Sequence, residues 1–98
     1  MMKPVEPLEL IVAQVVVSGR VQGVCYRAFT KEAAVKLGLG GWVRNLPDGG
    51  VQAEIEGPRE KIEKLLVQLR IGPPRASVTD LNVTWKSATG HAGFVILD

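Results

Sequence analysis

The nine-residue stretch GRVQGVCYR, residues 19–27, follows a valine-rich run, Leu10–Val17, that is typical of a central strand, and it opens a segment with helical spacing. Its two glycines allow the chain to turn back on itself with successive backbone N–H groups pointing inward, and the helix start adds unpaired donors. Backbone arranged in this way binds anions, above all phosphate. Arg27 falls in the first turn of the helix, where its guanidinium would lie beside the anion. The stretch therefore predicts a phosphoryl-binding site at the end of the first strand.

The motif differs from two common phosphate-binding loops. It lacks the Gly-Lys-[Ser/Thr] ending of a Walker A loop and the glycine spacing of a dinucleotide-binding turn. Spacing alone would equally allow an ordinary strand-to-helix connection. The candidate phosphate-binding residues are Gly19, Arg20, Val21, Gln22, Gly23, Val24, Cys25, Tyr26 and Arg27.

Hydrophobic periodicity and turn residues divide the rest of the chain into short elements. The turn Pro47-Asp48-Gly49-Gly50 separates two strand-like segments, and Gly72-Pro73-Pro74 ends the second of two helical patterns. We expect helices over residues 24–37 and 58–71, and strands over residues 10–17, 42–46, 51–56, 78–85 and 93–97.

This order, β-α-β-β-α-β with a short extra strand at the end, predicts an α+β fold of the ferredoxin-like kind. Such a fold is a two-layer sandwich, with two helices on one face of a mostly antiparallel sheet. Residues 10–98 are expected to form a single domain, preceded by a mobile leader over residues 1–9. The fold does not decide the function, because the same architecture carries RNA-binding, metal-binding and regulatory modules.

Composition excludes several function classes. The chain has 98 residues and a net charge of +2, which is too small and too scattered for a dedicated nucleic-acid surface. Its apolar runs are shorter than the ~18 residues of a membrane span, and the amino terminus does not have the pattern of a signal peptide. The single cysteine, Cys25, excludes an internal disulfide and a cysteine-based zinc cluster. We expect a cytoplasmic monomer without a nucleic-acid or membrane partner.

The run GRVQGVCYR, followed by KEAAVKLGLGGWVRNLPDGGVQAEIEG, closely resembles the acylphosphatase family. The similarity extends from about Val15 to Trp85 and includes the patterns Gly-x-Val-Gln-Gly-Val-x-[aromatic]-Arg, Gly-x-Val-x-Asn and Asp-Gly-x-Val. The resemblance implies the same ferredoxin-like architecture. It also implies hydrolysis of acyl phosphates, without metal or cofactor, to a carboxylate and inorganic phosphate.

The resemblance assigns roles to particular residues of this sequence. The family's phosphate loop corresponds to residues 19–26, its catalytic arginine to Arg27 and its water-binding asparagine to Asn45. The bound phosphate itself is implied to take the proton of the attacking water. Inorganic phosphate and sulfate are expected to inhibit by occupying the loop. The sequence departs from the family where Tyr26 replaces a common phenylalanine and where Leu46 replaces a frequent small hydroxyl residue.

Two other functions stay open at this point. A ferredoxin-like nucleic-acid module would need exposed aromatic residues and a basic sheet face, and the acidic residues Glu54 and Glu56 argue against it. A domain that binds phosphate without turning it over is the second alternative, and the presence of both Arg27 and Asn45 argues against that. A nucleophilic role for Cys25 would need a base, and the only histidine, His91, is far away in the sequence.

The remaining charged residues have simpler interpretations. Glu54 and Glu56 alternate with apolar residues and are expected on a solvated strand face, and His91 is expected in an exposed loop. Cys25 is expected to pack within the loop. Arg20 could attract anions or could point into solvent, whereas strand alternation places Arg44 on the face opposite Asn45.

Overall fold

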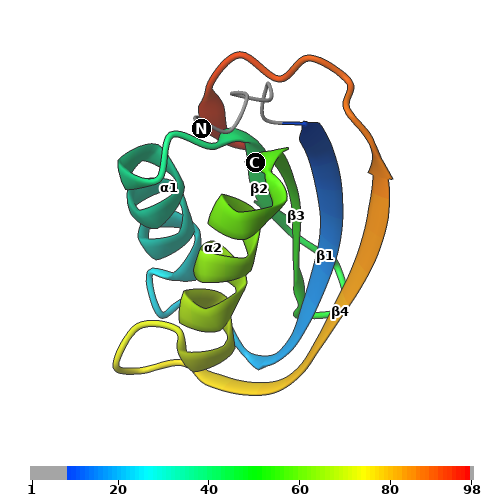
Figure 1. Cartoon of the computed structure of the whole chain (residues 1–98). Helices are drawn as coiled ribbons and strands as arrows, with labels where there is room; N and C mark the ends of the chain where they lie inside the picture. Colours follow the sequence, from blue (N-terminus) through cyan, green and yellow to red (C-terminus); the bar gives the residue numbers. More distant parts are fainter. Residues whose placement is uncertain (1–8, 98) are drawn as a thin grey trace, which may run out of the picture.

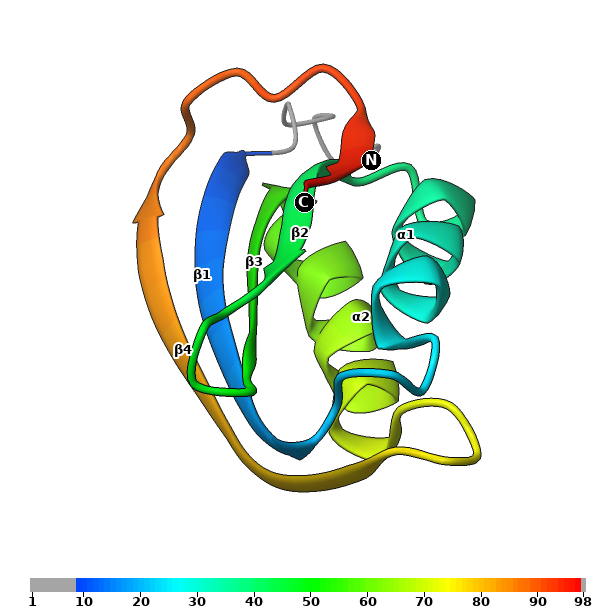
Figure 2. The same cartoon turned by 180° about the vertical axis from the view of Figure 1, so that it is seen from behind.

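The computed structural model describes residues 9–97, in which two helices cover one face of a five-stranded sheet (Figures 1 and 2). Both views show the helices side by side in one layer and the sheet in the other. The expected leader, residues 1–9, lies outside the described residues except for its last residue. The elements are β1 (Leu10–Arg20), α1 (Tyr26–Lys36), β2 (Gly40–Asn45), β3 (Val51–Pro58), α2 (Arg59–Ile71), β4 (Ser77–Ser87) and β5 (Phe94–Ile96).

The sheet has the strand order β4-β1-β3-β2-β5. Strand β1 pairs antiparallel with β3 and β4, and β2 pairs antiparallel with β3. The short strand β5 joins the edge at β2 in the parallel direction, because the β4–β5 connection runs around the end of the sheet (Figure 1). The predicted two-layer α+β sandwich with a mostly antiparallel sheet is confirmed.

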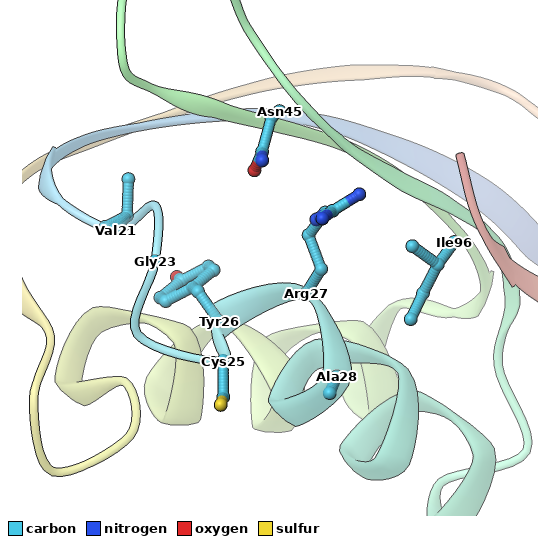
Figure 3. Close-up of a pocket in the computed structure, with 8 residues that line it drawn as sticks. All are labelled: Val21, Gly23, Cys25, Tyr26, Arg27, Ala28, Asn45 and Ile96. Carbon is cyan, nitrogen blue, oxygen red and sulfur yellow. The ribbon is translucent and has the colours of Figure 1, made fainter. Parts of the chain in front are cut away.

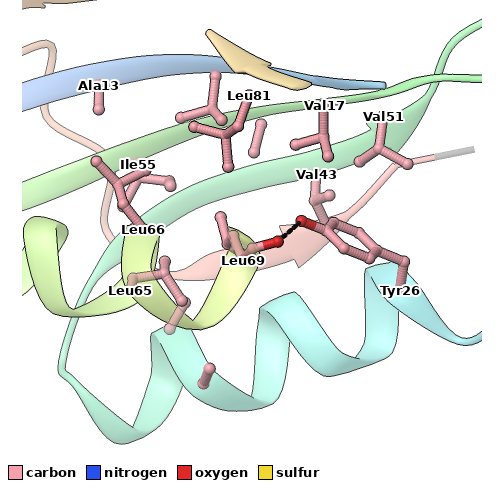
Figure 4. Close-up of a cluster of buried hydrophobic side chains, with 14 of the residues drawn as sticks. Ala13, Val17, Tyr26, Val43, Val51, Ile55, Leu65, Leu66, Leu69 and Leu81 are labelled. Atoms are coloured by element: carbon pink, nitrogen blue, oxygen red, sulfur yellow. Dashed lines mark hydrogen bonds between the residues drawn. The ribbon is translucent and has the colours of Figure 1, made fainter. Parts of the chain in front are cut away.

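The core lies between the sheet and the helices (Figure 4). Strand alternation turns one side of β1 and β3 toward the helices. Helix α2 packs against this side with apolar residues at helical spacing, as predicted. The buried residues of this interface include Ala13, Val15, Val17, Val43, Val51, Ala53, Ile55, Ile62, Leu65, Leu66 and Leu69.

Tyr26 connects the first turn of α1 to the last turn of α2. Its side chain is buried, and its hydroxyl donates a hydrogen bond of 2.7 Å to the carbonyl oxygen of Leu69 (Figure 4). In a regular helix that carbonyl would accept from residue 73, but Pro73 has no N–H group. The phenol therefore supplies the donor that the proline removes. Burial raises the pKa of the Tyr26 phenol, so the hydroxyl keeps its proton.

Tyr26→Phe is therefore expected to lower the free energy of unfolding by about 1–3 kcal/mol, the range for leaving a buried carbonyl without its donor. Urea unfolding monitored by circular dichroism measures this loss. Thr30→Val is the matched control, since the Thr30 hydroxyl bonds the Tyr26 carbonyl inside α1, where the helix already supplies an N–H donor. Equal stability of Tyr26→Phe and wild type would contradict the assigned role of the phenol.

The outer face of the sheet corrects three predictions. Glu54 and Glu56, expected to be solvated, are only 8% and 5% exposed, because the β4–β5 connection covers this end of the face. The Glu56 carboxylate accepts hydrogen bonds from the backbone N–H groups of Thr89, Gly90 and His91 and from the Thr89 hydroxyl. His91, expected to be exposed, lies with Nε2 2.9 Å from Glu54 Oε1 and has a side chain that is 24% exposed. Strand alternation predicts which face of the sheet a side chain lies on, but it does not predict whether a segment distant in the sequence covers that face.

Both carboxylates are stabilised in their charged form. Hydrogen bonds from His91 and Gln14 lower the pKa of Glu54, with a smaller contribution from Lys86. Burial alone would raise the pKa of Glu56, but the N–H groups of the β4–β5 connection outweigh it and lower the pKa below its ordinary value. A buried carboxylate that accepts several N–H bonds is a structural anchor that holds the connection on the sheet.

These shifts predict acid lability. Because the folded-state pKa of each carboxyl group lies below its unfolded value, the unfolded chain binds more protons in acid than the folded chain does. The contribution of these groups to the free energy of unfolding is therefore complete above the unfolded pKa of about 4.3. It is lost as the pH falls below that value. Urea unfolding between pH ~3 and ~7 should show a midpoint that declines at the acid end. Glu56→Gln is expected to be less stable at neutral pH and to decline less in acid, whereas the exposed Glu60→Gln should decline like wild type. An identical acid decline in Glu56→Gln would remove Glu56 as a cause.

Candidate active site

A cleft of about 390 Å³ opens where the loop after β1, the start of α1, the end of β2 and strand β5 meet (Figure 3). Several of the residues predicted from the sequence line it together, although they lie far apart along the chain. The lining residues are Val21, Gly23, Cys25, Tyr26, Arg27, Ala28, Asn45 and Ile96.

The loop reaches the cleft through two left-handed residues. Gly23 has a φ of 74° and Cys25 a φ of 65°, a region that residues with a side chain adopt at an energetic cost of about 1–2 kcal/mol. The first hydrogen bond of α1 runs from Phe29 N–H to the Cys25 carbonyl, over 3.0 Å. Within the described residues no side chain caps this helix start, and its first turn carries no acidic residue. The positive end of the helix dipole therefore lies at the cleft, which residues of the first turn line, and that turn itself carries no anion.

The Cys25 side chain does not pack within the loop, contrary to the prediction. The residue is exposed, and its sulfur points away from the space between Asn45 and Arg27 (Figure 3). His91 is not among the residues that line the cleft, and its ring is held at Glu54 on the other face of the sheet. The cleft therefore does not combine a thiol with a base.

Arg27 projects from the first turn of α1 toward Asn45 and Ile96 (Figure 3). Its Nη1 donates a hydrogen bond of 3.1 Å to the carbonyl oxygen of Leu97, and the Leu97 N–H donates to the Val43 carbonyl over 2.8 Å. The segment after β5 thus orients the guanidinium, and this bond uses one of the five N–H groups of the fork. Sequence reasoning missed Leu97, because a backbone acceptor carries no signal in the side-chain pattern.

Asn45 is the last residue of β2, and its side chain points into the same space as Arg27 (Figure 3). Its neighbour Arg44 lies on the opposite face, as alternation predicts, where it is exposed and donates two hydrogen bonds to the Gln52 side-chain oxygen. The Arg44 guanidinium also lies 5.3 Å from the ring centre of Trp42. The end of β2 therefore offers the cleft an uncharged amide rather than a second cation.

The other predicted loop residues do not line the cleft. Gly19 and Arg20 still belong to β1, where Arg20 pairs with Ser77 of β4 and is exposed. Val24 is buried in the core. Gln22 points toward the β2–β3 turn rather than into the cleft. The predicted phosphate-binding stretch is therefore divided between strand, core and cleft.

Two properties of the described residues bear on other classes of site. Residues 9–97 contain no group of three or more histidine, cysteine, aspartate or glutamate side chains placed to hold a metal ion. Neither described helix is both long and apolar enough to cross a membrane.

Comparison with known proteins identifies a family for the chain. A family model described as acylphosphatase matches residues 13–96. The chain is 48% identical over 85 residues to an acylphosphatase of Pelotomaculum thermopropionicum, covering 86% of this chain and 92% of that protein. It is 50% identical over 82 residues to an acylphosphatase of Methanocella arvoryzae, covering 84% and 93% of the two chains.

Solved structures show the same relationship. The crystal structure of acylphosphatase from Bacillus subtilis matches with a TM-score of 0.88 at 38% identity, covering 90% of this chain and 99% of that one. The family model's match, residues 13–96, includes both the loop after β1 and the end of β2, and the resemblance of the sequence to the acylphosphatase family is confirmed. The chain therefore belongs to the acylphosphatase family.

Proposed function

We propose that this protein hydrolyses the carboxyl–phosphate bond of acyl phosphates and that the cleft of Figure 3 is its active site. The observation that carries the proposal is the opposition of two groups across one space. Arg27 and the uncapped start of α1 suit a phosphoryl group, and Asn45 faces them from the end of β2. The family supports the reaction, since the relatives that match most of the chain are acylphosphatases.

The chemistry needs few protein groups. A carboxylate is a good leaving group and requires little or no general acid, so the protein has to screen the phosphate charge, orient the group and place a water in line. The guanidinium of Arg27 and the N–H groups of the loop and helix start perform the first two tasks. The Asn45 amide, with both a donor and an acceptor, holds the water. The water's proton passes to a phosphate oxygen, and the reaction requires no metal ion.

The same site explains the expected inhibitors. Inorganic phosphate and sulfate present oxygens in the same tetrahedral arrangement as the substrate's phosphoryl group, and we propose that they compete for Arg27 and the loop amides. Arg27 and Asn45, the two groups of the proposed site, come from the same chain, and we propose that the protein acts as a monomer. We also propose a cytoplasmic location, where the free thiol of Cys25 would stay reduced.

The decisive experiment measures phosphate release from a synthetic aryl acyl phosphate, such as benzoyl phosphate, with and without a chelator. We expect turnover that the chelator does not change and that inorganic phosphate inhibits competitively. Calorimetry should show in parallel that phosphate raises the melting temperature, following RT ln(1 + [L]/Kd), whereas chloride at matched ionic strength does not. Phosphate stabilisation without turnover would identify a binding module instead of an enzyme. Absence of both would refute the site itself.

A further inference from the structure

Gln22 belongs to the phosphate-loop motif but does not line the cleft. Its side-chain nitrogen donates two hydrogen bonds, over 2.7 Å to the carbonyl oxygen of Leu46 and over 2.9 Å to that of Gly50. A side-chain amide has two N–H donors, so both are engaged by these carbonyls. Both side-chain donors of Gln22 are therefore engaged, and their partners lie in another part of the chain.

Those partners are the two ends of the β2–β3 turn. Leu46 directly follows Asn45, and its N–H donates to the Gly50 carbonyl over 2.8 Å. Within the turn, Gly49 N–H donates to the Leu46 carbonyl and Gly50 N–H donates to the Asp48 carboxylate. Each of the two carbonyls thus accepts one bond from the turn and one from Gln22. The turn is closed on itself, and Gln22 fastens it to the loop after β1.

This contact spans the two halves of the proposed site. The loop and α1 hold the phosphoryl group, and the end of β2 holds the water, so the distance from phosphorus to water depends on how the two segments are spaced. An error of about 1 Å in such a distance can lower a rate about 10²-fold. A side chain that bridges the loop to the residue after Asn45 controls that spacing directly.

We propose that Gln22 is a positioning residue, which sets the in-line placement of the attacking water by fixing Asn45 relative to the bound phosphate. This inference rests on the proposed function. The Gln22 side chain acts through Asn45, because both of its donors bind the turn that follows Asn45. Its loss should therefore change turnover more than phosphate affinity, because Arg27 and the helix start are anchored elsewhere, to Leu97 and to the body of α1.

The test compares variants of matched size. Gln22→Met keeps the length of the side chain and removes both donors, whereas Gln22→Lys restores donors of similar reach. Gln52→Met is the control, since Gln52 lies beside the same turn but accepts its bonds from Arg44 on the outer face of the sheet. For each variant kcat, KM, the inhibition constant of phosphate and the urea midpoint are measured with benzoyl phosphate as substrate.

Gln22→Met is expected to lower kcat by about 10–10²-fold while the inhibition constant of phosphate stays within about twofold of wild type. Gln22→Lys should recover part of kcat, and Gln52→Met should match wild type. Gln22→Asn, one methylene shorter, provides the same comparison if the methionine variant is too unstable to assay. A normal kcat in Gln22→Met, or a phosphate affinity that falls as much as kcat, would overturn the proposal.

A double-mutant cycle separates positioning from general support. If Gln22 acts through Asn45, Gln22→Met should have little further effect on kcat in an Asn45→Ala background. Losses that multiply would show that Gln22 acts independently and would overturn the inference while leaving the proposed function intact. Near-normal turnover of Asn45→Ala alone would instead refute the role of Asn45, and with it both proposals.

Discussion

Asn45→Ala is expected to lower the turnover of acyl phosphates by about 10²–10³-fold, the usual effect of removing one well-placed polar group from a transition state. The side chain lies at the end of β2 and points into the cleft opposite Arg27, where it contacts the water rather than the phosphate in our proposal. Phosphate binding should therefore remain within about twofold of wild type. Steady-state kinetics with benzoyl phosphate and phosphate inhibition measure the two quantities separately.

Arg27→Ala is expected to differ from Asn45→Ala in its effect on phosphate affinity. The guanidinium contacts the phosphoryl group in both ground and transition states, so its removal should abolish phosphate affinity and turnover together. Arg44→Ala is the matched control, because Arg44 is next to Asn45 but is exposed on the opposite face. Asn45→Ala with near-normal kcat would exclude Asn45 from the mechanism. Arg27→Ala with intact phosphate inhibition would exclude the guanidinium from the binding site.

Gly41→Ala is expected to destabilise the protein more than Tyr26→Phe does, with a decrease of about 3 kcal/mol or more in the free energy of unfolding. Gly41 lies in β2 with a φ of 133°, and a Cβ atom there would overlap the backbone carbonyl of Glu54 in β3. Its N–H also donates to the Gly93 carbonyl over 2.8 Å, beside β5. Displacement of β2 would thus disturb pairing with both neighbouring strands.

Urea unfolding measures this loss, and Gly93→Ala is its control. A Cβ atom at Gly93 meets no atom within 4 Å, and the residue does not have a left-handed φ, so the control should change stability by less than about 1 kcal/mol. Because β2 carries Asn45 and pairs with β5, Gly41→Ala should also lower kcat in whatever fraction remains folded. If Gly41→Ala were as stable as Gly93→Ala, the backbone of β2 and β3 would have to move apart at little energetic cost, and the prediction would be wrong.

The order of elements could be predicted from the sequence because each has its own hydrophobic period and is bounded by turn residues. The strand boundaries were less accurate. The expected strand 10–17 continues to Arg20, because β4 keeps pairing with β1 beyond an irregularity at Ser18/Gly19. The expected strand 42–46 begins earlier, at Gly40. Glycine is needed at Gly41 because the backbone of β3 passes close by, and at Gly40 because the backbone of the β4–β5 connection does.

The candidate site was predictable only in part. Arg27 and Asn45 could be named from the motif, and the structure brings both to one cleft. Their supports could not be named, because Gln22 and Arg27 bond to backbone carbonyls whose positions depend on the whole fold. The burial of Glu56 was missed for the same reason, since its partners are N–H groups that lie more than 30 residues away in the sequence.

The uncapped start of α1 has a consequence for how this protein would behave in the cell. If phosphate occupies that end, the ligand acts as the cap of the helix, and the same contacts that favour binding also favour the folded helix. Product inhibition and protection against heat would then be two measurements of a single interaction. Such a protein would be most stable when its product, phosphate, accumulates and inhibits catalysis. It would unfold most easily when phosphate is scarce and the active site is unoccupied.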